Sequence, residues 1–181
     1  VTPHVKVGGE NVLAIRLDNP KDSSRWYPGG GIYRNVWLTK TASVHVGQWG
    51  VQITTPKISK DEAIVQVVTT LESAVDAAEV KVATALFALN PDDSKSRRAV
   101  AQLTTSGIAL SAGRPEKASV SFKIPKPKLW SVAHPNRYVA VTKIELGGKV
   151  VDQVESPFGI RTIQFTADNG FLLNGERLPI Q

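Results

Sequence analysis

The sequence has neither cysteine nor methionine among its 181 residues. Without cysteine the chain forms no disulfide bond, thiolate zinc site or cysteine nucleophile. Oxidising compartments do not require disulfides, so this absence leaves the location open, with secreted and periplasmic locations both compatible. No apolar run approaches the length of about 20 residues that crosses a bilayer, and we therefore expect no membrane contact.

Concentrated charge of one sign is also missing. The formal net charge is +6, yet the lysines and arginines are scattered, with short groups only at Arg97-Arg98 and around Lys126. Nucleic acid binding requires a concentrated basic surface. The basic residues are therefore interpreted as solvated surface charges, and no nucleic acid partner is expected.

Motifs for metal ions and phosphates are absent from the sequence. His4, His45 and His134 lie far apart and lack the spacing of a zinc site. The glycine run at Gly29 to Gly31 lacks the Lys-Ser/Thr pair of a phosphate-binding loop. We therefore expect no metal ion and no cofactor in this chain.

The sequence does contain short runs in which apolar and polar residues alternate. Such runs predict β-strands. In the clearest run the two faces separate fully, with Ala118, Val120, Phe122 and Ile124 opposite Lys117, Ser119, Ser121 and Lys123. A second run, Tyr138 to Leu146, ends in Gly147-Gly148, which favours a tight hairpin into Val150-Val151. We predict one core between two sheets, holding Val120, Phe122, Tyr138, Ile144 and Val151.

Further strands are predicted along most of the remaining chain, at Val12 to Leu17, Ile32 to Thr39, Val44 to Thr54, Ala63 to Leu71, Glu79 to Leu89 and Arg98 to Thr105. A turn is expected between the last two, from Asn90 to Ser94. The stretch between Leu71 and Leu89 is rich in residues that favour helix. Its alternation at Val80, Val82 and Thr84 nevertheless assigns it to a sheet.

This spacing of strands and turns predicts an all-β protein with an immunoglobulin-like β-sandwich over residues 43–157. Residues 1–42 contain too few strands to bury a sheet on two sides, so they are assigned to the end of a preceding domain. Residues 158–181 are assigned to the start of a following one. The fold class is therefore a sandwich flanked by strands of neighbouring domains.

Three motifs, in order along the chain, resemble the family 2 glycoside hydrolases. The first comprises Asn11 to Asn19 and then Ser24 to Leu38, where Ser-Arg-Trp-Tyr-Pro leads through glycines into Gly-Ile-Tyr-Arg-Asn-Val-Trp-Leu. It is similar to the last strands of the family's N-terminal sugar-binding jelly roll. The glycines supply turn dihedrals that other residues resist.

The second and third motifs lie in the last third of the chain. Leu129-Trp130-Ser131, with Pro135 and Tyr138, is similar to a stretch near the end of the family's middle sandwich, although Arg137 replaces the usual leucine at an expected strand start. Phe158-Gly159-Ile160-Arg161 resembles the exit from that sandwich. Gly170-Phe171-Leu172-Leu173-Asn174-Gly175 resembles the hairpin that introduces the catalytic (β/α)₈ barrel.

The resemblance implies a retaining enzyme, which requires two carboxylates about 5 Å apart. In the family these come from later barrel strands, one of them a glutamate that follows an asparagine, and this sequence contains no Asn-Glu dipeptide. No catalytic residue is therefore assigned. The adjacent pairs Asp61-Glu62 and Asp92-Asp93 are interpreted as solvated turn residues, because neighbours in an extended chain point to opposite faces.

Asp22, Arg25 and Trp26 are the only candidate site residues, as a substrate rim in the parent enzyme. Trp26 is a large aromatic in a polar loop, and in β-galactosidases of the family this loop reaches the rim of the active site. Trp37 and Trp130 are instead assigned to packing.

The resulting hypothesis is a non-catalytic domain of a retaining enzyme that acts on terminal β-galactosides. It would brace the sugar-binding domain against the barrel, so its partners are those two domains of the same parent chain, with a galactoside as the parent's substrate. The alternatives are a carbohydrate-binding module without hydrolytic activity and an adhesion-type immunoglobulin domain. A binding module should retain sugar when isolated, whereas a brace should not.

Overall fold

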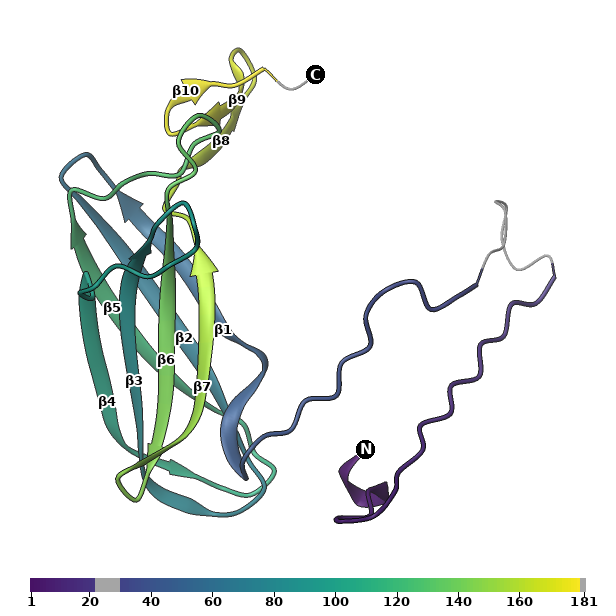
Figure 1. The fold of residues 1–181 in the computed structure, drawn as a ribbon. Coiled ribbons are helices and arrows are strands. Elements are labelled where there is room, and N and C mark those ends of the chain that lie inside the picture. Colours follow the sequence, from purple (N-terminus) through teal and green to yellow (C-terminus); the bar gives the residue numbers. More distant parts are fainter. Residues whose placement is uncertain (22–29, 180–181) are drawn as a thin grey trace. The chain divides into compact units, whose positions relative to one another are not determined.

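A computed structural model describes residues 1–21 and 30–179 of the chain (Figure 1). Clustering of contacts divides the chain into two compact units, Val1–Thr39 and Lys40–Gln181, which are described separately. The second unit is a β-sandwich with a small hairpin sheet beyond it, and it confirms the predicted all-β class. In the described ranges, no helix is long and apolar enough to span a bilayer.

The sandwich consists of two antiparallel sheets. The three-stranded sheet has the order β1-β2-β5, with β1 at Val44–Ile58, β2 at Glu62–Ser73 and β5 at Glu116–Pro125. The four-stranded sheet has the order β4-β3-β6-β7, with β4 at Ala101–Leu110, β3 at Ala77–Leu89, β6 at Arg137–Leu146 and β7 at Lys149–Phe158. Figure 1 shows the two sheets face to face.

The predicted alternation in β5 is confirmed. Phe122 and Ile124 are buried, whereas Ser121 and Lys123, which alternate with them along the strand, are exposed. The predicted hairpin is also present, since Leu146 pairs with Lys149 across the two intervening glycines. Both glycines have positive φ, 58° and 74°, which suits the twist of a two-residue hairpin.

The single core that the sequence predicts is divided into two clusters. Phe122 and Tyr138 belong to one and Ile144 to the other, while Val120 and Val151 are only partly buried at their edges. Three buried threonines mark the division, because on β2, β3 and β6 each lies between the residues of the two clusters. They are Thr69, Thr84 and Thr142, none more than 1% exposed.

Two predicted strands are not strands in this structure. The segments at Val12 to Leu17 and Ile32 to Thr39, both in the first unit, lack strand pairing. A strand requires a hydrogen-bonded neighbour, and the described part of the chain provides none for them. Their apolar side chains are consequently exposed, including Val12, Leu13, Ile32, Tyr33, Trp37 and Leu38. Farther along, β4 begins at Ala101 rather than Arg98.

A small sheet follows β7, with the order β10-β9-β8. It contains β8 at Ile163–Thr166, β9 at Gly170–Leu173 and β10 at Glu176–Arg177. The turn between β9 and β10 uses Asn174 and Gly175, with φ of 53° and 81°. Figure 1 shows this hairpin sheet beyond the end of the sandwich.

Candidate functional site: the C-terminal joint

The predicted rim residues Asp22, Arg25 and Trp26 lie outside the described residues. The structure therefore does not test their assignment. The described residues do, however, include the two acidic pairs, the three histidines and most of the basic residues that the sequence analysis considered.

The pair Asp92-Asp93 lies in a turn, as predicted. The Asp92 carboxylate accepts hydrogen bonds from the main-chain N–H and the hydroxyl of Ser94, at 3.0 and 2.6 Å. These bonds, the hydroxyl first, hold the pKa of Asp92 below its usual value. Asp93 pairs with Arg137, the first residue of β6, so the arginine that departs from the family pattern ties this turn to the strand start.

The prediction of a solvated turn at Asp61-Glu62 holds for Asp61, which is exposed in a bend, and is wrong for Glu62, which is partly buried as the first residue of β2. Glu62 contacts Lys123 at 2.5 Å and Lys57 at 3.2 Å. The hydrogen bond from Lys123, followed by that from Lys57, lowers the pKa of Glu62. Its partners are lysines on the neighbouring strands β5 and β1, so Glu62 links three strands at the surface of one sheet.

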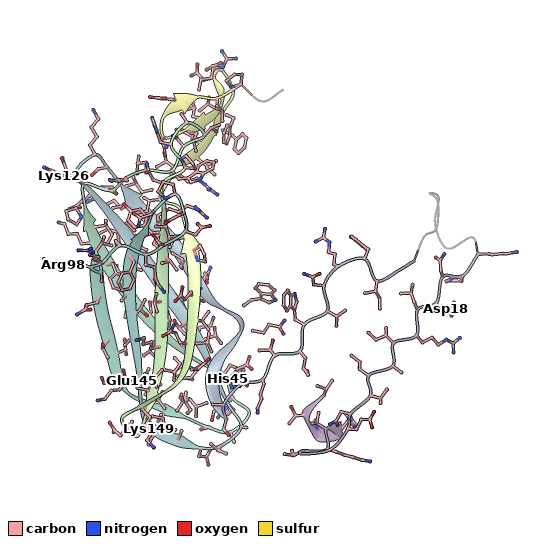
Figure 2. The ribbon with its side chains drawn as sticks, in the orientation of Figure 1. Asp18, His45, Arg98, Lys126, Glu145 and Lys149 are labelled. Atoms are coloured by element: carbon pink, nitrogen blue, oxygen red, sulfur yellow. The ribbon has the colours of Figure 1, made fainter. Side chains whose placement is uncertain are left out.

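The histidines and the basic residues lie apart from one another in the described ranges. No group of three or more His, Asp or Glu side chains there is placed to hold a metal ion. His45 lies 3.6 Å from a Glu72 carboxylate oxygen. Arg98, Lys126 and Lys149 are exposed at separate places on the second unit (Figure 2).

The second and third sequence motifs meet at the C-terminal end of the sandwich, a contact that their spacing did not predict. The Trp130 N–H donates to the carbonyl oxygen of Ile160 at 2.8 Å. The Trp130 carbonyl oxygen accepts from the side-chain amide of Asn174 at 2.9 Å. One residue is thus bonded to the sandwich exit on one side and to the hairpin on the other.

Asn174 is bonded to the exit segment as well. Its side-chain oxygen accepts from the Thr162 N–H at 3.0 Å, and its own N–H donates to the Thr162 carbonyl oxygen at 3.0 Å. Its φ of 53° lies in the left-handed region, which asparagine tolerates better than most residues. The Asn174 side chain therefore links its own hairpin turn to the segment at Trp130 and to the exit segment at Thr162.

Gly159 and Arg161 enclose the Trp130 side chain. A Cβ at position 159 would lie 2.9 Å from the Trp130 Cβ, so only glycine fits there without displacement. The Arg161 guanidinium lies 4.8 Å from the centre of the Trp130 ring, within the range of a cation–π contact. Between them, Ile160 is fully buried in the cluster that contains Tyr138.

We name this arrangement the joint: Trp130, Gly159, Ile160, Arg161, Thr162 and Asn174. Its anchor, Ile160, belongs to the sandwich core, and Asn174 belongs to the hairpin. The contact joins residues of the second and third motifs. Neither motif by itself shows that the other packs against it, so the sequence contains no local signal for the contact.

Residues 44–161 match the family described as Glycosyl hydrolases family 2. The chain belongs to this family. A curated member of glycosyl hydrolases family 2, Beta-galactosidase BoGH2A of Bacteroides ovatus, is 39% identical over 99% of this chain and 21% of its own length. A Beta-glucuronidase of Formosa agariphila is 30% identical over 99% of this chain and 20% of its own length.

Solved structures of glycosidases are similar in fold to this chain. The beta-glucuronidase of Bacteroides uniformis has a TM-score of 0.69 and 27% identity, covering 81% of this chain and 18% of that one. A beta-glycosidase from Bacteroides vulgatus has a TM-score of 0.64 and 28% identity, covering 85% and 18%. The chain spans about a fifth of the length of the curated relatives it matches.

Proposed function

We propose that this chain is the sandwich region of a longer family 2 glycoside hydrolase that acts on terminal β-galactosides with retention. In that enzyme it braces the sugar-binding domain against the catalytic barrel. The joint is the observation that carries the bracing role, because it ties the buried core residue Ile160 to a hairpin outside the sandwich through hydrogen bonds on both sides of Trp130.

The proposed domain boundaries are residues 1–42 for the end of the jelly roll, 43–157 for the sandwich and 158–181 for the lead-in to the barrel. Large apolar side chains of the first segment are exposed, Tyr33 at 86% and Leu38 at 86%. In the last segment Phe165 is 74% exposed. Large apolar side chains exposed in this number are typical of segments that other elements cover, which supports neighbouring domains on both sides.

Galactosides are preferred over glucuronides as the proposed substrate. Support comes from the Ser-Arg-Trp-Tyr and Gly-Ile-Tyr-Arg sequence, and from the relative named as a β-galactosidase, whose identity of 39% exceeds the 30% of the β-glucuronidase. The test compares kcat/KM of the parent enzyme for nitrophenyl β-galactoside and β-glucuronide. A higher value for the glucuronide would overturn the galactoside assignment.

Asp22, Arg25 and Trp26 remain the proposed rim of the parent's substrate site. The guanidinium of Arg25 has donors in a fixed fork suited to sugar oxygens, and Trp26 has a flat face for a ring. Replacing Arg25 or Trp26 by alanine in the parent should lower kcat/KM tenfold or more, about 1.4 kcal/mol of transition-state binding. Wild-type kinetics with lowered thermal stability would assign the loop a structural role instead.

The isolated 181-residue chain should neither hydrolyse nitrophenyl glycosides nor retain sugars. The reaction requires a carboxylate pair that the family supplies from the barrel. Inhibitor-sensitive turnover by the pure chain would contradict the bracing role. Retention on immobilised galactosides would favour the alternative of a carbohydrate-binding module.

A further inference from the structure

An apolar surface surrounds the hairpin sheet, and we name it the hairpin patch: Val132, Ile163, Phe165, Phe171 and Leu178. Val132 is 65% exposed, Ile163 52% and Phe165 74%. The Phe165 and Phe171 rings lie 5.1 Å apart and support one another. A sheet with strands of four, four and two residues is too small to bury these side chains on its own.

Arg161 stands between two hollows that border this patch. One hollow, of about 250 Å³, is lined by Trp130, Val132, Ile163 and Phe171 among others. The other, of about 330 Å³, lies toward β1 and is lined by Ile53, Thr55 and Phe158 among others. Arg161 and Ile163 line both. Arg161 is therefore the one charged residue among the described residues that line these two hollows.

The Arg161 charge has no carboxylate partner within the described part of the chain. Some other cations of the same unit form ion pairs, such as Arg137 with Asp93 and Lys123 with Glu62, while Arg98 and several lysines form none with a described residue. Arg161 instead has its guanidinium above the Trp130 ring, with no hydrogen bond to any described residue. Stacking holds the group in place and leaves the donors at its edge available for a carboxylate.

We infer that the hairpin patch and Arg161 form the docking surface for the domain that follows in the parent enzyme, and that Arg161 pairs there with a carboxylate of that domain. This inference rests on the proposed function. In the proposed function the occupant continues directly from the hairpin, and the match covers only 21% of the length of the B. ovatus relative. A second copy of this chain is the alternative occupant. A two-fold contact centred on the patch would bring two Arg161 cations together, and their repulsion disfavours such a dimer.

The experiment measures hydrogen exchange of residues 162–179 in two proteins, the isolated 181-residue chain and the full parent enzyme. Arg161→Gln removes both the cation–π contact and the proposed ion pair, whereas Arg161→Lys keeps the charge. Arg98→Gln is the matched control, because Arg98 is exposed and lies away from the patch. In the isolated chain only the stacking contact is available to be lost.

We expect Arg161→Gln to raise exchange of the hairpin at least tenfold more in the parent than in the isolated chain. Arg161→Lys should keep part of the protection, and Arg98→Gln should change nothing. Equal effects of Arg161→Gln in both proteins would overturn the inference, since stacking alone would then explain them.

Phe165→Ser tests the apolar part of the surface in the same two proteins. Because the ring is 74% exposed, the isolated chain should keep its unfolding midpoint, while the parent should lose the protection of the hairpin. If the isolated wild-type chain sediments as a dimer that Phe165→Ser dissociates, the patch binds a second copy and the inference fails. None of these measurements uses a substrate, so an error in the galactoside assignment would leave their outcome unchanged.

Discussion

Asn174 donates a hydrogen bond from its side-chain amide to the main-chain oxygen of Trp130, 2.9 Å away, although 44 residues separate the two in the sequence. The same side chain accepts from the Thr162 N–H. Asn174 is therefore the residue at which the hairpin is attached to the sandwich, and the joint can be tested by substituting it.

Asn174→Ala should loosen the hairpin more than Asn174→Gly. Both variants lose two side-chain hydrogen bonds, each worth about 0.5–1.5 kcal/mol, because one is exposed to solvent and the other only partly buried. Alanine in addition strains a backbone with φ of 53°, which glycine adopts freely. Asn174→Asp should be intermediate, because its carboxylate still accepts from Thr162 but has no donor for Trp130.

Hydrogen exchange of the Thr162 and Leu178 amides measures this ranking. Asn169→Ala, in the other turn of the hairpin, is the control, since the Asn169 side chain has no hydrogen-bond partner in the described chain. Equal exchange in the alanine variants at positions 169 and 174 would show that Asn174 does not hold the joint.

Phe122→Ala should lower the free energy of unfolding by about 3–5 kcal/mol. The ring is 2% exposed and belongs to the cluster that contains Leu86 and Ile160, so its removal leaves a cavity between the sheets. Urea unfolding of the isolated chain measures the loss, with Ser121→Ala on the exposed face of the same strand as control. A loss below about 1 kcal/mol would contradict the packing of β5 in this core.

Thr84 and Thr142 should show strong energetic coupling. Their hydroxyl oxygens lie 3.3 Å apart, and both side chains are buried on facing positions of β3 and β6. Replacing either by valine leaves the other hydroxyl without its partner, which costs about 1–3 kcal/mol. Replacing both removes the unpaired group, so the double variant should lose less than the two single losses together.

A double-mutant cycle by urea unfolding measures this coupling directly. Losses that add within about 0.5 kcal/mol would mean that the two hydroxyls do not depend on one another.

Glu62 should stabilise the sandwich at neutral pH and lose that effect in acid. Lys123, and then Lys57, lower its pKa in the folded state from the ordinary 4.5. A lowered folded pKa means that the stabilisation is fully present above about pH 4.5 and disappears as the pH falls through the lowered value.

The difference in unfolding free energy between wild type and Glu62→Gln, measured from pH 7 to pH 3, should therefore shrink toward zero. The effect should be modest and weaker in high salt, because the Glu62 side chain is only partly buried and both lysine partners are exposed to solvent. Asp61→Asn is the control, since Asp61 forms no ion pair with any described residue. A difference that grows in acid would have the wrong sign for this explanation.

The sequence by itself determined the strands of the sandwich and their faces. Side chains alternate with a period of two in any strand, so the apolar positions Phe122 and Ile124 identify the buried face before any partner is known. A pair of glycines between two such runs likewise specifies a tight turn, because both positions require positive φ. The family resemblance also came from local motifs, which depart from the family pattern at Arg137.

Only the tertiary structure decided what those motifs do together. Trp130, Arg161 and Asn174 are far apart along the chain, and no periodicity records that they meet, because contact depends on where the folded sheets bring the strand ends. The same reason explains the threonines that divide the core, since Thr84 lies opposite Thr142 only through pairing of β3 with β6. It also explains Val12 to Leu17, whose pattern suits a strand but whose backbone has no described neighbour to pair with. Local patterns specify what a segment can form, and long-range pairing decides whether it forms it.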